Sequence, residues 1–216
     1  MSFGEKLMTI IHLVRHPEAT KHTTAMLKAK GAPLTAEGEK QARLLTLRFA
    51  KVPLRRVFSS PYHRTLKPAQ DLADAADTEV TILDELGEFQ RPSSFGDEEL
   101  ERKDPRRKAW MRTLTTPGER FEDGECYDTS LLIADMLLSS WKDLGGESIA
   151  MLHGWKGLTF WLRALFGEKM APWMLEICHA QAKMAYTGIT TIQFKPNKKG
   201  ISNWNVLSQN DTSHLR

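Results

Sequence analysis

The sequence has little of what marks several large classes of protein. Its 216 residues include only two cysteines, Cys126 and Cys178, which lie far apart and outside any CxxC pair. This excludes a disulfide framework and favours a reducing, cytoplasmic environment. No apolar run approaches the roughly 18 residues of a membrane span, and the N-terminus lacks the pattern of a secretory signal. We therefore expect a cytoplasmic protein with no membrane partner.

Charge of one sign is not in excess either. The chain carries 30 Lys and Arg against 27 Asp and Glu, a formal net charge of +3. A protein that binds a nucleic-acid duplex usually has a concentrated basic stripe, so we expect no nucleic-acid partner. Small anions need only a local cluster of positive charge. At roughly 150 residues per domain, the length predicts one domain over 1–216, with a polar insertion or lid at about 91–120.

Short apolar segments alternate with amphipathic ones along the chain. The pattern predicts strands at 8–14, 56–59, 80–83 and 148–152, helices at 35–51, 60–77, 128–144 and 155–167, and a final hairpin over 189–194 and 201–207. This alternation is typical of an α/β fold. We expect a three-layer sandwich in which helices flank a central sheet that is mostly parallel.

The segment 97–108 holds ten charged residues in twelve. One interpretation is a solvated insertion that is helical until Pro105 breaks it. The other is a lid whose Arg106 or Arg107 reaches over the active site toward a second anionic group on the substrate.

Several catalytic motifs are missing: GxGxxG, GxxxxGK[ST], HExxH and GxSxG do not occur. His12 and His16 are four residues apart, but on a strand that spacing is about 13 Å, too far to share a metal ion. A zinc site at these histidines is therefore disfavoured.

Two predicted strands end at a histidine. His16 follows Arg15 at the end of the first strand, and His153 follows the fourth. Ligands of such sheets bind outside the carboxyl ends of the strands, so we expect both imidazoles at one edge. Imidazole is a competent nucleophile toward phosphorus, and arginine neutralises the transferring oxygens. The departing alkoxide also needs a proton, from a carboxyl group with a raised pKa.

Six segments in order resemble the histidine phosphatase superfamily, which is also named for cofactor-dependent phosphoglycerate mutase. They are 13–16 (LVRH), 33–38 with 41–42 (PLTAEG, QA), 59–65 (SSPYHRT), 86–89 (LGEF), 152–154 (LHG) and the C-terminal residues 204–207, 210–211 and 214–215. The match therefore runs along most of the chain.

The resemblance implies a role for each matching residue. His16 is the nucleophile that becomes phosphorylated, while Arg15, Arg64 and His153 line the phosphate pocket and stabilise the transferring oxygens. Glu88 protonates the leaving group and then activates water. The implied partner is a small phosphorylated substrate. No metal ion and no organic cofactor is implied, because the arginines supply the positive charge.

Other assignments of the acid stay open, because Glu85, Glu98 and Glu99 lie nearby. The sequence also departs from the family at three positions: Pro17 stands where glycine usually follows the nucleophile, Ala19 replaces the usual hydroxyl residue, and His22 stands where asparagine is often found. Proline supplies no amide hydrogen, so the backbone of residue 17 has no donor to offer a phosphate. These changes concern the shape of the pocket, and thus the substrate, more than the chemistry.

Three functions compete on this sequence. The first is a phosphomonoester hydrolase that acts through a phosphohistidine, and the second is a phosphoglycerate-type mutase. Mutases of this family carry a longer insertion with arginine and tyrosine after the acid, whereas 91–120 has Arg106 and Arg107 but no tyrosine. The third is a non-catalytic binding or scaffold protein, which the five filled catalytic positions disfavour. We therefore expect hydrolysis.

Overall fold

The fold is built on one six-stranded sheet with the strand order β3-β2-β4-β1-β5-β6. This computed structural model describes residues 8–20, 31–96, 98, 100–196 and 202–216. The strands are β1 (Thr9–Arg15), β2 (Leu54–Ser59), β3 (Val80–Ile82), β4 (Gly146–Leu152), β5 (Ile189–Pro196) and β6 (Ser202–Asp211). The first four run parallel to one another, and β5 and β6 pair antiparallel at one edge. The predicted α/β class with a mostly parallel sheet is confirmed.

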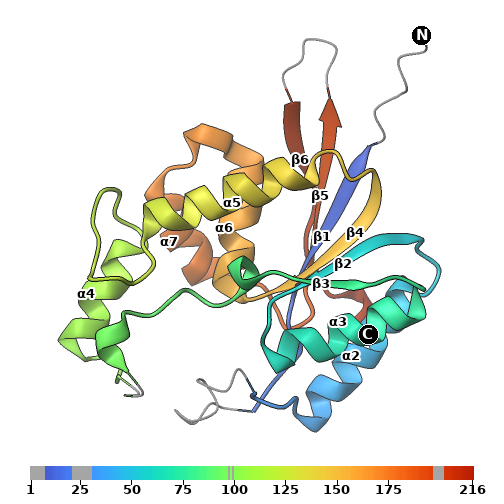
Figure 1. The fold of residues 1–216 in the computed structure, drawn as a ribbon, viewed down its shortest axis with the longest axis horizontal. Helices are drawn as coiled ribbons and strands as arrows, with labels where there is room; N and C mark the ends of the chain where they lie inside the picture. Colours follow the sequence, from blue (N-terminus) through green and yellow to red (C-terminus); the bar gives the residue numbers. More distant parts are fainter. Residues whose placement is uncertain (1–7, 21–30, 97, 99, 197–201) are drawn as a thin grey trace.

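Helices cover both faces of the sheet (Figure 1). The helices α2 (Ala36–Phe49) and α3 (His63–Ala75) pack on one face, and α5 (Tyr127–Trp141) and α6 (Gly154–Phe166) on the other. The alternation of β1 explains the two cores, because successive side chains of a strand point to opposite faces. Ile11 and Leu13 are buried against α5 and α6, and Val14 is buried against α2 and α3.

The N-terminus of α2 fixes the chain that follows β1. Thr35 caps the helix by accepting a hydrogen bond from the Gly38 amide, and its hydroxyl donates to the Glu18 carboxylate at 2.8 Å. The Glu18 amide in turn donates to Gln41 Oε1 at 2.9 Å. A Cβ atom at Gly38 would lie 1.9 Å from the Glu18 carbonyl oxygen, so only glycine permits this approach. The PLTAEG segment therefore holds the residues just after His16.

Two helical predictions need correction. The helix α3 begins at His63 with Tyr62 as its N-cap, not at Ser60, so 60–62 form a turn. Pro105 does not break a helix but begins one, α4 (Pro105–Thr113), and the described residues 98 and 100–104 before it are not helical. Asp104 caps α4 by accepting hydrogen bonds from two backbone amides, and proline at the first helical position gives up no hydrogen bond. A further helix, α7 (Pro172–Gln181), was not predicted.

The described part of the segment 91–120 is partly apolar. Together with Phe89 it forms a small apolar cluster of its own, consisting of Phe89, Phe95, Leu100, Trp110 and Leu114. In Figure 1 α4 lies well away from the sheet, on the side of α5 and α7. Across the described residues, we find no helix whose length and hydropathy would let it cross a lipid bilayer.

Candidate active site

The two predicted histidines meet at the carboxyl edge of the sheet. β1 and β4 are parallel neighbours in register, with Arg15 opposite Leu152, so the next residue of each strand is a histidine. The His16 amide donates to the Leu152 carbonyl at 3.0 Å, and the two ring centroids lie 5.1 Å apart. Both rings are buried.

His16 is held in the form that a nucleophile needs. Its Nδ1 lies 2.7 Å from the Pro17 carbonyl oxygen, which only accepts hydrogen bonds, so Nδ1 carries the hydrogen and Nε2 keeps its lone pair. Burial lowers the pKa of His16 well below its usual value, and the neighbouring His153 and Arg64 lower it further. The ring is therefore neutral at pH 7. The glycine that usually follows this histidine in the family is absent, but residue 17 still supplies a carbonyl that orients the His16 ring.

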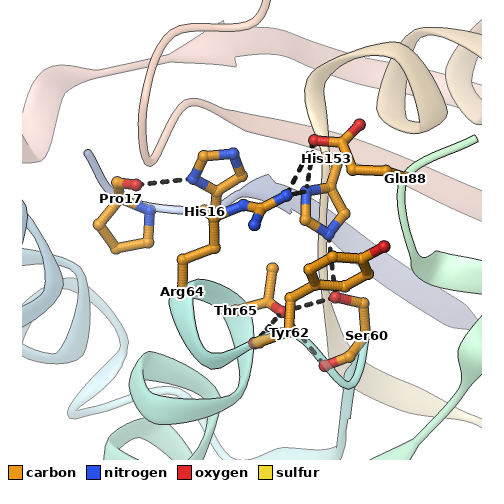
Figure 2. A network of polar contacts seen from close by, with 8 residues as sticks. All are labelled: His16, Pro17, Ser60, Tyr62, Arg64, Thr65, Glu88 and His153. Carbon is orange, nitrogen blue, oxygen red and sulfur yellow. Dashed lines mark hydrogen bonds and ion pairs between the residues drawn. The ribbon is translucent and has the colours of Figure 1, made fainter. Parts of the chain in front are cut away.

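Arg64 lies between the two histidines and the acid (Figure 2). It projects from the first turn of α3, and its side chain is 1% exposed. Its Nη2 donates to Glu88 Oε1 at 3.0 Å and lies 3.1 Å from His153 Nδ1. Glu88 Oε1 is also 3.0 Å from His153 Nδ1. The Glu88 carboxylate thus sits against the positive groups that would hold a phosphoryl oxygen.

The electrostatics of Glu88 differ from the expectation for the acid. Enclosure by protein raises the pKa of Glu88, but His153, Arg64 and His16 together outweigh it and hold the pKa well below the usual range. The structure therefore contradicts the raised pKa expected for the acid. The fixed charge beside Glu88 is the guanidinium of Arg64, 3.0 Å away, which stabilises the charged form of the carboxylate.

His153 is fixed from behind by a chain of hydroxyl groups. Its Nε2 lies 3.0 Å from Ser60 Oγ, which lies 2.6 Å from Thr65 Oγ1. The Thr65 hydroxyl donates to the Tyr62 carbonyl at 2.7 Å, so it accepts from Ser60, and Ser60 in turn accepts from His153 Nε2–H. Nδ1 of His153 is then the ring atom that faces Arg64 and Glu88 (Figure 2). Sequence analysis quoted Ser60 and Thr65 within the motif but gave them no role.

Two buried guanidinium nitrogens keep unused hydrogen-bonding capacity. Among the residues that the structure describes, Nε of Arg15 and Nε of Arg64 have no hydrogen-bond acceptor. The rest of the Arg15 side chain is held in place, because one terminal nitrogen donates to the Met184 carbonyl at 2.6 Å and the guanidinium lies 4.2 Å from the centre of the Tyr186 ring. A buried donor without an acceptor is costly, so these N–H groups favour an anion in the site.

Two cavities open at this point of the molecule. The smaller measures about 130 Å³ and is lined by Arg15, His16, Glu88, Gly154, Trp155, Leu158, His179, Lys183 and Met184. A cavity of this volume is large enough to admit a tetrahedral oxyanion. The larger, of about 690 Å³, lies under α4 and shares Glu88 and Trp155 with the smaller.

Three side chains of this site, His16, Glu88 and His153, could also be considered as metal ligands. Ligand atoms of His16, Glu88 and His153 lie within 4.8 Å of one another, which is close enough to surround an ion. Arg64 Nη2, however, lies within 3.1 Å of both Glu88 and His153. A metal ion bound there would face a permanent positive charge at short range, so this donor set fits an anion better than a cation.

Neither of the two other candidate acids that the structure describes, Glu85 and Glu98, lines the cavities. Glu98 pairs with Arg106 at 2.9 Å. Glu99 lies outside the described residues, as does His22. Arg106 is also paired with Asp104 at 3.0 Å, so of the two arginines proposed for a lid only Arg107 lines a cavity.

Sequence analysis missed a buried ion pair that supports the acid segment. Lys156 of α6 and Glu125 form a salt bridge, with side chains 3% and 6% exposed. The Gln90 amide donates to Glu125 Oε2 at 3.1 Å, and the Glu125 amide donates to the Gln90 carbonyl at 2.8 Å. Gln90 is two residues from Glu88, so the pair anchors the loop that carries the acid. The signal available in the sequence was Lys156, which interrupts the mostly apolar stretch 155–162.

Comparison with known proteins assigns the family. The family model of the histidine phosphatase superfamily (branch 1) matches residues 11–207. The chain belongs to the histidine phosphatase superfamily. Within it, a curated relative named probable phosphoglycerate mutase GpmB, from Yersinia enterocolitica, is 25% identical over 96% of this chain and 95% of its own.

Solved structures of this superfamily share the fold. A phosphoserine phosphatase mutant from Entamoeba histolytica in complex with phosphoserine is 25% identical, with a TM-score of 0.64 over 96% of this chain and 100% of its own. A putative α-ribazole-5′-P phosphatase from Escherichia coli has a TM-score of 0.69 at 19% identity, over 94% and 96% of the two chains. Family membership therefore gives a phosphatase- or mutase-type enzyme.

Proposed function

We propose that the protein is a metal-independent phosphomonoester hydrolase that acts through a phosphohistidine. The observation that carries the proposal is His16, a neutral imidazole whose Nδ1–H is held by the Pro17 carbonyl. A ring nitrogen of His16 lies within 4.8 Å of ligand atoms of Glu88 and His153, and Nε of Arg15 and Nε of Arg64 have no acceptor among the described residues. A neutral nucleophile beside fixed positive charge is the arrangement that phosphoryl transfer needs.

The reaction divides into two displacements at phosphorus. In the first, His16 Nε2 forms a bond to phosphorus, the ester P–O bond breaks, and the leaving alkoxide takes a proton from Glu88. In the second, the Glu88 carboxylate takes a proton from water, the water oxygen bonds to phosphorus, and the P–N bond breaks to release inorganic phosphate. Arg15, Arg64 and His153 neutralise the equatorial oxygens throughout.

Glu88 obtains its proton by way of substrate binding. A bound phosphoryl group brings negative charge to Arg64 and His153, the two groups that otherwise stabilise the Glu88 carboxylate. Displacement from them raises the pKa of Glu88, since like charges at short range disfavour ionisation. A phosphate monoester with its second pKa near 6 also carries in a proton. The substrate itself therefore brings Glu88 into the protonated form that can act as the acid.

A phosphoglycerate-type mutase is the second candidate, favoured by the name of the GpmB relatives. Against it, the segment 91–120 contains no tyrosine, and the 690 Å³ cavity beside Glu88 stands partly open at α4. A mutase must keep water from its phosphohistidine. A scaffold role on the same fold would leave the site unreactive.

The test is hydrolysis of p-nitrophenyl phosphate by the wild type and by His16→Ala, with and without EDTA. We expect the substitution to abolish turnover and to remove an acid-labile phosphoprotein, and EDTA to have no effect. Activity that survives in His16→Ala, or that is lost with EDTA, contradicts the mechanism. A bisphosphoglycerate-dependent exchange of phosphate between positions of phosphoglycerate identifies the mutase, and complete inertness toward a phosphate panel identifies the scaffold.

A further inference from the structure

The large cavity under α4 is larger than the reacting phosphoryl group requires. Its volume of about 690 Å³ falls within the range of roughly 300–1,000 Å³ that is typical of small-molecule sites. It adjoins the smaller cavity, because Glu88 and Trp155 line both. Since Glu88 is the group that protonates the leaving oxygen, the rest of the leaving group extends into this space.

The walls of this cavity are apolar and aromatic. They consist of Phe89, Phe95, Leu100, Trp110, Met111 and Trp155. The Phe89 and Trp155 rings lie 5.8 Å apart, and Trp155 is held from its other side by stacking on His179 at 3.4 Å. Flat, fixed aromatic faces of this kind bind apolar or aromatic groups by burial and stacking.

The lining of the cavity also carries charged side chains, with more arginines than carboxylates among the described residues. Arg91, Arg102 and Arg107 line it against Glu88 and Glu101. Arg91 is engaged, because it donates to the Glu98 carbonyl at 2.7 Å. Arg107 differs: it is half-buried in the first turn of α4, and within the described part of the chain it has no side-chain acceptor. An arginine in this state is suited to bind a carboxylate or a second phosphate.

We infer that the substrate is a phosphomonoester of a bulky apolar or aromatic alcohol that carries a second anionic group, bound by Arg107. The inference rests on the proposed function, since that function places the leaving group beside Glu88. Small polar esters fill only the 130 Å³ cavity and leave the aromatic walls uncovered. Ring and anion together account for both the aromatic walls and the arginines of the larger cavity.

Non-hydrolysable phosphonates test the inference by calorimetry on the wild-type protein. The series is methylphosphonate, benzylphosphonate and para-carboxybenzylphosphonate. We expect the ring to tighten binding at least about tenfold through burial of its apolar surface. We expect the carboxylate to add about a further tenfold through a charge-assisted hydrogen bond to Arg107. Equal affinity for all three compounds, or no binding of any, overturns the inference.

Matched variants on α4 separate a specific contact from a general effect of charge. Arg107→Gln and Lys108→Gln each remove one positive charge from adjacent positions, but only Arg107 lines the cavity. We expect Arg107→Gln to abolish the gain from the carboxylate, Arg107→Lys to keep part of it, and Lys108→Gln to keep all of it. An equal gain in the two glutamine variants refutes the role of Arg107.

The two proposals fail separately. A protein that prefers the carboxylated ring but hydrolyses no phosphomonoester contradicts the hydrolase, and only the preference of the cavity for an anionic ring then stands. A protein that hydrolyses p-nitrophenyl phosphate through His16 but shows no preference in the phosphonate series contradicts the inference alone.

Discussion

The Glu88 carboxylate contacts Arg64 and His153, the groups that the proposed mechanism assigns to the phosphoryl oxygens. Removal of the negative charge of Glu88 should therefore tighten the binding of an oxyanion. The perturbation is Glu88→Gln, which keeps the shape of the side chain and removes the negative charge 3.0 Å from Arg64 and His153. Two unit charges at about 4 Å repel by about 4 kcal/mol at an effective dielectric constant of 20. The carboxylate is 41% exposed, and screening by solvent reduces this to roughly 1–2 kcal/mol. The expected gain in affinity is therefore about tenfold.

Turnover should move in the opposite direction. Loss of the general acid should lower kcat by about 10²–10⁴ for substrates with poor leaving groups, and less for p-nitrophenyl phosphate. The assay combines calorimetric titration with inorganic phosphate and steady-state kinetics across leaving groups. Glu85→Gln is the control, because this carboxylate is three residues away and lines neither cavity. Weaker or unchanged phosphate binding in Glu88→Gln would refute the competition between carboxylate and phosphate, and equal slowing for all leaving groups would point to a different acid.

Three further predictions concern ionisation and packing. Burial lowers the pKa of His16 from 6.5, so NMR of labelled histidine should give a titration midpoint below 6.5. The contribution of this ring to stability should be lost as the pH falls through that lowered pKa. A midpoint at or above 6.5 would contradict the burial argument. Lys156→Met leaves the buried carboxylate of Glu125 without its cation and should lower the free energy of unfolding, measured in urea, by about 3–5 kcal/mol. Lys67→Met removes an exposed ion pair and should cost less than about 1 kcal/mol. Similar losses in the two variants would argue against the buried pair. Gly38→Ala forces a Cβ atom against the Glu18 carbonyl oxygen and should lower the free energy of unfolding by about 1–3 kcal/mol in the same assay. Lys40→Ala, at an exposed position of the same helix, should be close to neutral. A Gly38→Ala variant as stable as the wild type would show that the contact between residues 18 and 38 is not tight.

The sequence predicted the parts of the site that depend on strand ends. His16 and His153 each follow an apolar β-branched run, and parallel pairing of such runs brings their carboxyl ends together. Arg64 became a candidate only through the SSP segment before it, because an arginine on a helix is ordinarily a surface residue. The pairing of Lys156 with Glu125 joins residues that are 31 positions apart, so the sequence can show a lysine in an apolar stretch but not its partner.

Local signals also misled where two meanings compete. Pro105 was read as the end of a helix, but proline is equally suited to a first turn, and the preceding Asp104 is the capping residue that decides between them. The helix α7 has a weakly amphipathic sequence with exposed Trp173 and Ile177, so its apolar residues do not form one face. Its position depends on packing against α6 rather than on its own periodicity.

Proline at position 17 has a consequence for the proposed reaction cycle. The hydrogen bond from residue 17 to the His16 ring uses its carbonyl oxygen, which every amino acid possesses. Proline presents that oxygen from a backbone with one torsion already fixed, so less conformational entropy is spent on keeping it in place. The imidazole therefore has a rigid hydrogen-bond acceptor behind it both when the ring is phosphorylated and when the phosphohistidine is hydrolysed. A glycine at this position would give the same hydrogen bond on a looser hinge.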